Sequence, residues 1–432
     1  MQKLVVCVLF LASVFGKELS ISLPTKSRLL PVLIEEVKGA SLTDEYKREL
    51  LEALQFDFAV NAYTFVLDPK TLKKIHLSQM GDAFINFQSP KMQPYFTIQL
   101  NVEDEHLHVT FFNKEKTLVK HIRDIPLSLD AEKDRVVCHH IHDKIVKALL
   151  NIEGIASKKI LFCKRNAKQN FQVIYSDYDA KNQRIVTDEN ENCLCPKFIS
   201  SEGKSTQFLV VNYRSGQPKI HLGSLHSLEQ KRLVKLAGQQ LLPAISLQNN
   251  ALAFISDRTT NIDLFVQFID LKNKKASRPK QLFSYPNSTQ SSPTFSPDGK
   301  QIVFVSDKTS RPHLYLMPTY IKKQITPLKI TNKNEENTCP AWSFDGKRIA
   351  YVAKIDGVRQ IWILEIKTQE EWQLTFDKKN KENPCFAPDN LHLIYNAQED
   401  EDSNLYLIDL HQKKPVRITH GKQQKRFACF EM

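Results

Sequence analysis

The sequence has no apolar segment long enough to cross a membrane as a helix. Its longest hydrophobic run, Leu4–Val14, covers about eleven residues, whereas a spanning helix needs about twenty. The run follows Lys3 and leads into Val14-Phe15-Gly16, a pattern typical of an export signal that is cleaved after Gly16. We therefore predict that residues 1–16 are a signal peptide and that the mature protein works outside the cytoplasm.

The sequence also lacks an even set of cysteines. One of its eight cysteines, Cys7, lies in the predicted signal, and the remaining odd number cannot all pair within one chain. A fold held together by disulfide bonds is therefore not expected. Cys193 and Cys195 are two residues apart on a predicted strand, so we expect both to point the same way as small core residues.

Motifs for catalysis and metal binding are missing. The chain has no Gly-x-Ser-x-Gly turn, which would carry the nucleophile of a hydrolase domain. One predicted helix gathers possible ligands, namely Cys138, His139, His140 and His142. Cys138 and His142 lie one turn apart, but two ligands on one face do not close a metal site, and no second pair is evident upstream. We predict no catalytic residue, no metal and no cofactor.

Charge does not point to a nucleic-acid partner. The formal net charge is +12, from 60 Lys and Arg residues against 48 Asp and Glu residues. The lysines are scattered through turns instead of being gathered on one helix, so no nucleic-acid binding is predicted. With 41% hydrophobic and 25% charged residues, the chain has enough apolar surface for a large folded core.

The first part of the mature chain, residues 17–152, has the pattern of an α/β domain. Lys17–Leu23 alternates polar and apolar residues as a half-buried strand does; it either completes a sheet here or pairs with a partner's sheet. Thr43 and Asp130 are predicted helix caps. The other predicted elements are strands Pro31–Ile34, Phe56–Val66, Tyr95–Leu100 and Leu107–Asn113, and helices from Asp44 to about Gln55 and from Ala131 to Leu150.

The second part of the chain contains a repeat. The segment Pro293-Thr-Phe-Ser-Pro-Asp-Gly299 recurs as Pro340-Ala-Trp-Ser-Phe-Asp-Gly346 and as Pro384-Cys-Phe-Ala-Pro-Asp-Asn390. The copies are about 45 residues apart, a period typical of a four-stranded β-propeller blade. Proline suits the start of an innermost strand, and the aromatic residue two positions on packs between blades. The Asp-Gly pair supplies the following turn, so we interpret its carboxylate as structural.

Six blades are predicted for residues 153–432. Their second strands are Ile160–Cys163, Phe208–Val211, Leu252–Ile255, Ile302–Val305, Ile349–Val352 and Leu393–Tyr395, and fourth strands end in pairs such as Ile330-Thr331 and Leu374-Thr375. Only five first strands begin with proline, at Pro196, Pro243, Pro293, Pro340 and Pro384. We predict that Phe427–Phe430 supplies the sixth and closes the ring against the blade at 155–190, which leaves no open sheet edge.

These features together resemble the TolB family, the periplasmic component of the Tol–Pal envelope system of Gram-negative bacteria. The repeat resembles the family's propeller repeat, Lys17–Leu23 its N-terminal strand, and Lys147–Gly154 followed by Lys159–Phe162 the junction between its domains. The resemblance covers essentially everything after the signal. The departures are the turns Ser201-Glu-Gly203 and Leu247-Gln-Asn249 and a closing strand without proline.

The resemblance implies a non-enzymatic periplasmic adaptor that supports outer-membrane integrity and cell division. It implies that a propeller mouth binds the lipoprotein Pal and that the N-terminal strand binds the inner-membrane protein TolA. The protein is then expected to be a monomer that associates with membranes only through these partners. Carried onto this sequence, the Pal-binding residues precede the repeat prolines: Gln239, Gln240, Ser291, Ser292, Asn337, Thr338, Glu382 and Asn383. The TolA-binding residues are Lys17, Glu18, Leu19, Ser20, Ile21, Ser22 and Leu23.

Two other interpretations remain open from the sequence. A propeller can gate the catalytic domain of a hydrolase, which requires an additional α/β-hydrolase domain. A propeller can also be a ligand-binding protein, an enzyme or a lectin with metal or sugar sites in its central channel, but the spacing of His and acidic residues predicts no convergent set. Screening the purified protein for hydrolysis and for metal content distinguishes these classes from an adaptor.

Overall fold

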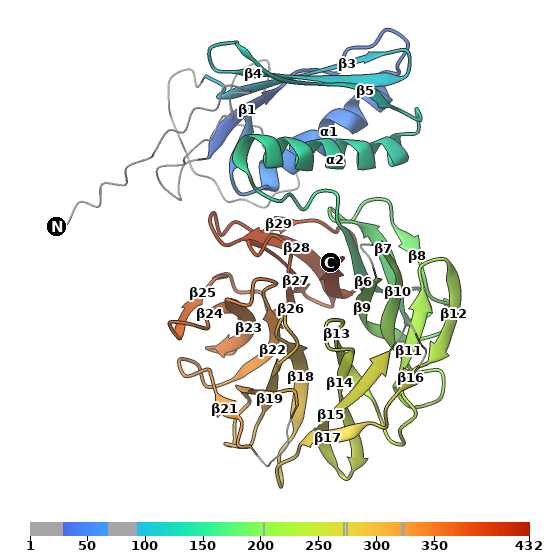
Figure 1. Cartoon of the computed structure of the whole chain (residues 1–432), viewed down its shortest axis with the longest axis vertical. Coiled ribbons are helices and arrows are strands. Elements are labelled where there is room, and N and C mark those ends of the chain that lie inside the picture. Colours follow the sequence, from blue (N-terminus) through green and yellow to red (C-terminus); the bar gives the residue numbers. More distant parts are fainter. Residues whose placement is uncertain (1–28, 68–92, 202–203, 271–272, 274, 321–324) are drawn as a thin grey trace, which may run out of the picture.

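The computed structural model describes residues 29–67, 93–201, 204–270, 273, 275–320 and 325–432. The predicted signal peptide and the predicted strand Lys17–Leu23 lie outside these residues. The described chain forms two bodies, a small α/β domain and a β-propeller on which it is stacked (Figure 1). No helix within the described ranges is long and apolar enough to cross a membrane.

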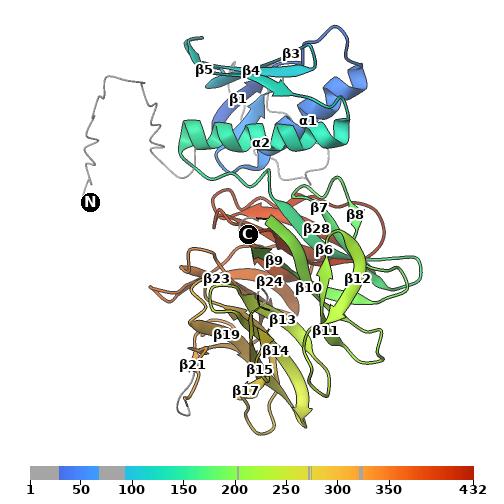
Figure 2. The same ribbon diagram turned by 45° about the vertical axis from the view of Figure 1, so that its right-hand side comes forward.

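The N-terminal domain has one five-stranded sheet in the order β2-β1-β3-β4-β5. Its strands are β1 (Leu30–Ile34), β2 (Thr64–Leu67), β3 (Phe96–Glu103), β4 (His106–Asn113) and β5 (Leu118–Pro126). β1 is parallel to β2 and β3, whereas β3, β4 and β5 pair antiparallel. Helices α1 (Asp44–Val60) and α2 (Ala131–Leu150) lie between the sheet and the propeller (Figure 2).

Both helices begin where the sequence predicts, because Thr43 and Asp130 accept hydrogen bonds from backbone N–H groups of the first turn. The predicted strand Phe56–Val66 is wrong over its first half, where α1 continues. Leu50, Leu54 and Phe58 follow one another at helical spacing and are buried, so the helix gains from one more turn. The strand β5 was not predicted.

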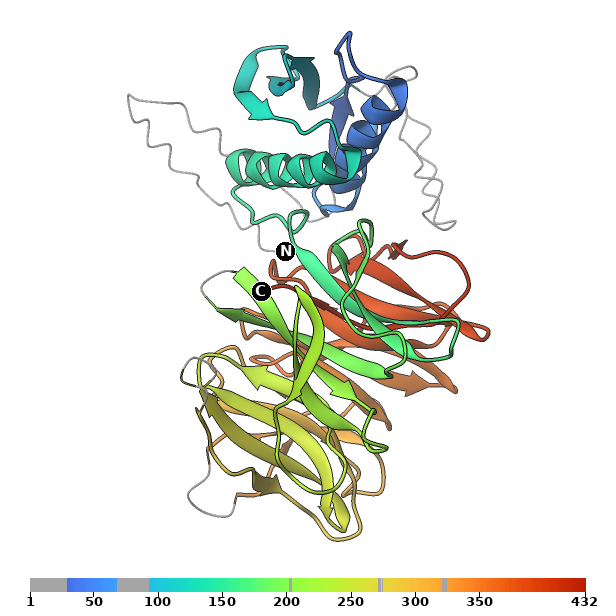
Figure 3. The ribbon, with the colours of Figure 1, turned by 90° about the vertical axis from the view of Figure 1, so that its right-hand side faces the viewer.

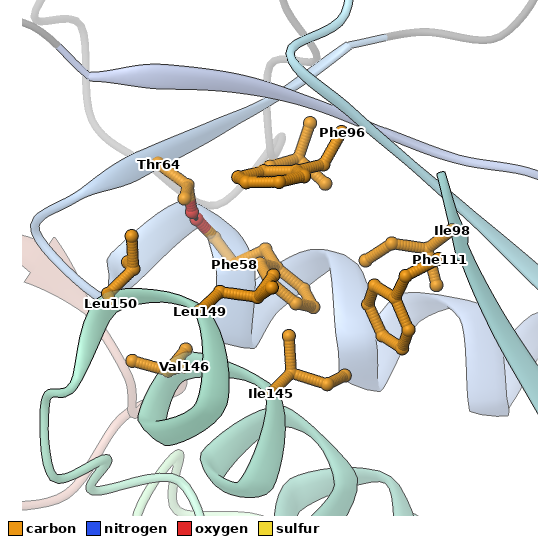
Figure 4. Close-up of a pocket in the computed structure, with 10 residues that line it drawn as sticks. Phe58, Thr64, Phe96, Ile98, Phe111, Ile145, Val146, Leu149 and Leu150 are labelled. Atoms are coloured by element: carbon orange, nitrogen blue, oxygen red, sulfur yellow. Dashed lines mark hydrogen bonds between the residues drawn. The ribbon is translucent and has the colours of Figure 1, made fainter. Parts of the chain in front are cut away.

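The core of the N-terminal domain is closely filled. Figure 4 shows Phe58, Ile145 and Leu149 from the helices pointing toward Phe96 and Phe111 from the sheet. The cavity left between them has a volume of about 10 Å³ and an apolar lining, so it has no room for a ligand.

The rest of the chain forms six sheets arranged as a propeller. From the innermost strand outward, the first two sheets are β9 (Cys193–Ser201), β10 (Lys204–Asn212), β11 (Lys219–Ser224) and β12 (Ser227–Arg232), and then β13 (Leu241–Ser246), β14 (Ala251–Thr259), β15 (Asn261–Asp270) and β17 (Lys280–Phe283), with β16 (Lys275–Ala276) on β15. The next two are β18 (Gln290–Phe295), β19 (Gln301–Ser306), β20 (His313–Pro318) and β21 (Leu328–Lys329), and then β22 (Asn337–Trp342), β23 (Arg348–Ile355), β24 (Val358–Glu365) and β25 (Glu370–Gln373). The last two are β26 (Lys381–Phe386), β27 (His392–Glu399), β28 (Asp402–Asp409) and β29 (Val416–Arg417), and then β30 (Lys425–Phe430), β6 (Lys159–Arg165), β7 (Phe171–Asp177) and β8 (Arg184–Ile185).

The predicted closure of the ring is confirmed. β30 pairs antiparallel with β6, from Lys425 opposite Lys164 to Phe430 opposite Ile160. The last strand of the described chain thus completes the blade that begins the propeller, where the red and green strands meet in Figure 3. Because the ring is closed, no innermost strand among those described is left as an open edge.

In four of the six blades the fourth strand ends directly before the Val-Thr, Ile-Thr or Leu-Thr pair predicted to end it. In four blades the threonine of that pair accepts a hydrogen bond from a third-strand N–H through its Oγ1 atom, at 2.8 to 3.2 Å. The four threonines are Thr187, Thr331, Thr375 and Thr419. The side chain therefore replaces a backbone partner, and the fourth strand can end early.

Cys193 and Cys195 do not point the same way, contrary to the prediction. Cys193 packs with Phe198 and Phe208, whereas Cys195 packs with Leu209 in a different cluster. The reason is that Cys195 has a left-handed backbone, with φ at 54°, which interrupts the alternation of the strand. All seven described cysteines are free thiols.

Candidate functional site: the propeller mouth

The two ends of the propeller differ in what covers them. The N-terminal domain packs on one end of the propeller. This end carries the turns that join innermost strands to second strands and third strands to fourth strands. There, His392 Nε2 lies 2.7 Å from the carbonyl oxygen of Val60, and the Tyr178 hydroxyl donates to Asp57 at 2.6 Å. The opposite end is formed by the segments that enter the innermost strands and the hairpins beside them. We call this opposite end the mouth.

Every innermost strand bulges at the mouth. The residue before each repeat proline, or before Ala428 in β30, has a left-handed backbone with φ between 47° and 55°. These residues are Cys195, Leu242, Ser292, Cys339, Asn383 and Phe427. The pairing with the second strand shifts register at each of them. None is glycine, so the conformation costs about 1–2 kcal/mol at each position other than Asn383. The bulges bend the strand ends and set the direction of the mouth segments.

A ring of buried side chains supports these bulges. Each of its members lies three residues before a repeat proline, or before Ala428 in β30. Its members are Cys193, Gln240, Gln290, Asn337, Lys381 and Lys425, each at most 3% exposed. Gln240 accepts from the N–H of Ile220 in the preceding blade at 3.2 Å. Asn337 Nδ2 lies 3.0 Å from His313 Nδ1, also in the preceding blade. At these two positions the ring ties the mouth segment to its neighbour, because buried polar groups need partners.

The structure divides the eight residues implied to bind Pal into two groups. Gln240 and Asn337 belong to the buried ring, so their side chains are not available at the surface. Gln239 is exposed, and the other five residues are half-buried around the mouth. These five are Ser291, Ser292, Thr338, Glu382 and Asn383. The residues implied to bind TolA, Lys17–Leu23, lie outside the described residues.

The accessible mouth residues are held in place by polar contacts. Arg359 Nη2 lies 2.9 Å from Glu382 Oε1, and the side chains of this ion pair are 42% and 23% exposed. Asn383 donates from Nδ2 to Asn396 Oδ1 at 2.9 Å. Both residues keep hydrogen-bonding capacity at the surface, which suits a polar, wet interface.

Two charged groups at the mouth have strongly shifted pKa values. Burial opposes the ionisation of Glu399, but hydrogen bonds from Lys379, Tyr406 and Asn404 lower its pKa to about 2. Burial, with repulsion from Lys164, lowers the pKa of Lys425 to about 8. Each group is bonded to the segment leading into an innermost strand, so both shifts reflect structural contacts.

Two exposed aromatic side chains at the mouth were missed in the sequence. Phe376 is 71% exposed in the segment before β26, and Tyr285 is 45% exposed in the segment before β18. Aromatic side chains are enriched among the anchors of protein interfaces. Their only signal in the sequence is their position in a loop between a fourth strand and a repeat proline.

The possible metal ligands of α2 do not converge with one another. Cys138 lies in the hydrophobic core of the domain, and His142 is bonded to Asn61 through Nε2. His139 instead faces the propeller, where its ring and the carboxylates of Asp177 and Asp179 bring ligand atoms within 4.8 Å of one another. Sequence reasoning missed this grouping because two of its members come from the other domain.

The family model described as the TolB beta propeller domain matches residues 146–430. The chain belongs to the TolB family. The TolB homolog of Protochlamydia amoebophila is 36% identical over 391 residues, which cover 87% of this chain and 83% of that protein. The TolB homolog of Chlamydia pneumoniae is 35% identical over 395 residues, covering 88% of this chain and 90% of that protein.

A solved TolB structure has the same fold. The crystal structure of TolB from Acinetobacter baumannii matches with a TM-score of 0.72 at 17% identity and covers 94% of this chain and 97% of that chain. The α/β domain followed by a six-bladed propeller is therefore an architecture shared within the TolB family. The mouth is the end of this TolB propeller that the described N-terminal domain leaves uncovered.

Proposed function

We propose that this TolB-family chain is a non-enzymatic periplasmic adaptor of the Tol–Pal system that supports outer-membrane integrity and cell division. It binds a Pal-like lipoprotein at the mouth and a TolA-like inner-membrane protein through Lys17–Leu23. Family membership supports this assignment. The observation that carries the mouth assignment is the set of six left-handed bulges, since strained backbone is concentrated at functional sites.

The chemistry of the mouth suits the binding of a folded partner. Half-buried polar residues, among them Ser292, Thr338 and Asn383, share the mouth with the exposed rings of Tyr285 and Phe376. Aromatic anchors with polar, hydrated surroundings are typical of interfaces between proteins that also exist apart. The groups with shifted pKa values serve the fold, which also favours binding over catalysis.

The mouth assignment is tested with two matched ion pairs of the same blade region. Glu382→Lys breaks the contact with Arg359 at the mouth. Glu365→Lys breaks an ion pair at the opposite end of the propeller, where Arg348 Nε lies 3.0 Å from Glu365 Oε2. Both glutamates are 23% exposed, so the cost to folding is comparable. We expect the first change alone to weaken binding of the soluble domain of a Pal-like lipoprotein by about tenfold or more, or about 1.4 kcal/mol.

Binding of the same Pal-like domain to a Phe376→Ala variant is measured by isothermal titration calorimetry. Because this ring is largely exposed, the variant keeps its stability and loses affinity. Unchanged affinity in both Glu382→Lys and Phe376→Ala would exclude the mouth as the Pal-like site.

The N-terminal assignment is tested by deleting residues 17–23. Crosslinking in envelopes followed by mass spectrometry is expected to lose the TolA-like protein and to keep the Pal-like protein. Retention of the TolA-like crosslink would place its site elsewhere.

A screen of the purified full-length protein for hydrolysis tests the competing hydrolase interpretation, and turnover of any substrate class would contradict a purely adaptor role.

A further inference from the structure

The interface between the two domains contains a cluster of ionisable side chains that partner binding at the mouth does not use. Its members come from both domains and are at most 6% exposed. They are Asp57 of α1, Arg135 and His139 of α2, Asp177 at the end of β7, and Tyr178 and Asp179 in the turn that follows it. We call this set the interface cluster. Burying so many polar groups is costly unless each is paired, so their arrangement needs a reason.

His139 stands between carboxylates of the two domains. Its Nδ1 atom lies 2.8 Å from Asp57 Oδ2, and Tyr178 donates to the other oxygen of Asp57 at 2.6 Å. Its Nε2 atom lies 4.0 Å from Asp177 Oδ2 and has no hydrogen-bond partner among the described residues. When Nδ1 donates to Asp57, only a protonated ring also presents an N–H to the propeller side.

The charges of the cluster balance only if His139 is protonated. The three buried carboxylates face two cations, because Arg135 lies 2.5 Å from Asp179 and Lys159 of β6 pairs with Asp177. One buried negative charge therefore remains for His139 to neutralise. The partly exposed Glu49 of α1, 3.6 Å from Arg135, adds negative charge at the edge.

A divalent metal ion is a less favourable occupant than a proton. Both propeller carboxylates already hold a cationic side chain, and Asp177 Oδ2 also accepts from Asn182 at 2.7 Å. The neighbouring His142 is bonded at both ring nitrogens, to Asn61 and Asp143, so it supplies no ligand to the cluster.

We propose that protonated His139 clamps the N-terminal domain to the propeller and that the clamp opens when this proton is lost. The proposal concerns the orientation of the two domains and does not depend on the identity of the partners. It makes the position of the N-terminal domain relative to the mouth sensitive to pH outside the cytoplasm.

The direction of the pH dependence follows from the surroundings of His139. Burial alone lowers the pKa of this histidine. The negative charge of Asp57 and the hydrogen bond to it, together with the charges of Asp179 and Asp177, raise the pKa above the ordinary value. The clamp is therefore complete below about pH 6.5, the ordinary histidine pKa, and is lost as the pH rises through the higher value. His392, which contacts Val60 across the same interface, titrates in the same sense.

Hydrogen–deuterium exchange of the full chain between pH 6 and pH 9 tests the clamp, after correction for the intrinsic exchange rate. The readout is the exchange of peptides covering 57–61 and 177–182, with β19 and β23 as internal references for the fold. We expect exchange at the interface to rise with pH, by about tenfold for each unit by which the His139 pKa is raised. His140→Gln is the matched control, because His140 lies on the exposed face of α2 and should leave the profile unchanged.

Two variants separate the proton from the shape of the side chain. His139→Gln should raise exchange of the 177–182 peptide at pH 6 toward the value of the unmodified protein at pH 9, and the pH dependence that remains at 57–61 should be the part that His392 contributes through Val60. Asp177→Asn removes one carboxylate, so a neutral His139 balances the cluster and the 177–182 peptide should stay protected across the range. If His139→Gln fails to fold, Asp177→Asn carries the test alone.

Three results would overturn the proposal. The first is interface exchange in the unmodified protein that does not change between pH 6 and pH 9. The second is an Asp177→Asn profile that still follows pH as before. The third is loss of protection at pH 7 in EDTA with recovery on adding Zn²⁺, which would assign the cluster to a metal ion.

Discussion

The left-handed backbone at the bulge of each innermost strand is a property of the position and not of the side chain. Serine, asparagine, cysteine, leucine and phenylalanine all adopt it. Asparagine tolerates this conformation through its short polar side chain, but leucine and phenylalanine have no such compensation. The packing of the innermost strand against its neighbours must therefore impose the bulge.

At Ser292 this predicts that a valine and a glycine substitution differ in stability. Ser292→Val should destabilise the protein by about 1–2 kcal/mol relative to Ser292→Gly, because a β-branched residue is strained at a φ of 47° and glycine is not. Urea denaturation measures the difference. Thr294→Val, two residues on in the same strand, is the control and should change little; equal stability of the two Ser292 variants would contradict the strain argument.

Gly154 is required at the connection between the domains because it has no side chain. A Cβ atom there would lie 1.9 Å from Asp143 Oδ1. That carboxylate accepts from the N–H groups of Ala156 and Ser157 at 3.1 and 2.9 Å.

Gly154→Ala should therefore lower the free energy of unfolding by about 1–3 kcal/mol, because Asp143 must move away from buried donors. Chemical denaturation monitored by circular dichroism checks this value. Ser157→Ala, which removes only one side-chain donor to Asp143, should cost less. A larger effect of Ser157→Ala would show that the crowding at Gly154 is relieved at little cost.

At the level of elements, the sequence predicts the propeller better than the site. A repeated proline, aromatic residue and turn fix the period, and the apolar second strands mark each blade, so six blades and their closure follow. The buried stripe of α1 was hidden because Phe56, Phe58 and Val60 also alternate like a strand. The burial of Gln240 and Asn337 depends on contacts with the preceding blade, which local sequence does not contain.

Removing the strand β30 should open the ring. Deleting residues 425–432 exposes the edge of β6 and uncovers Leu161 and Phe162, which are fully buried. We expect soluble aggregates or loss of soluble protein, measured by size-exclusion chromatography with light scattering. Deleting Met432 alone, a residue that is 44% exposed, is the control. A monodisperse, folded protein without β30 would show that closure is dispensable.

At the scale of the whole molecule, the two domains meet through polar contacts as well as packing. Burial opposes protonation of His392, but Asp389 raises its pKa to about 8, and the ring contacts Val60 of α1. The propeller therefore contributes a charged group to hold the helix end, where carbonyl oxygens favour a cation.

His392→Gln should reduce the free energy of unfolding by up to about 2 kcal/mol at pH 6, from a pKa that rises from about 6.5 to about 8 on folding. The raised pKa stabilises the folded state fully below pH 6.5 and no longer does so once the pH has passed through 8. Urea denaturation at pH 6 and pH 9 should therefore give a large difference from the unmodified protein at pH 6 and a small one at pH 9. Equal differences at both pH values would mean that His392 is not charged in the folded state.

The pairing of Lys425 with Lys164 also dictates when the molecule can finish folding. β6 follows the N-terminal domain directly, yet its inner neighbour comes after every other strand of the described chain. Contacts so distant in sequence are slow to form, because a long loop must close before they are made. During synthesis and export the first blade therefore lacks its innermost strand until β30 has been made and exported. A chain that ends before β30 cannot close the ring, and the edge of β6 stays exposed.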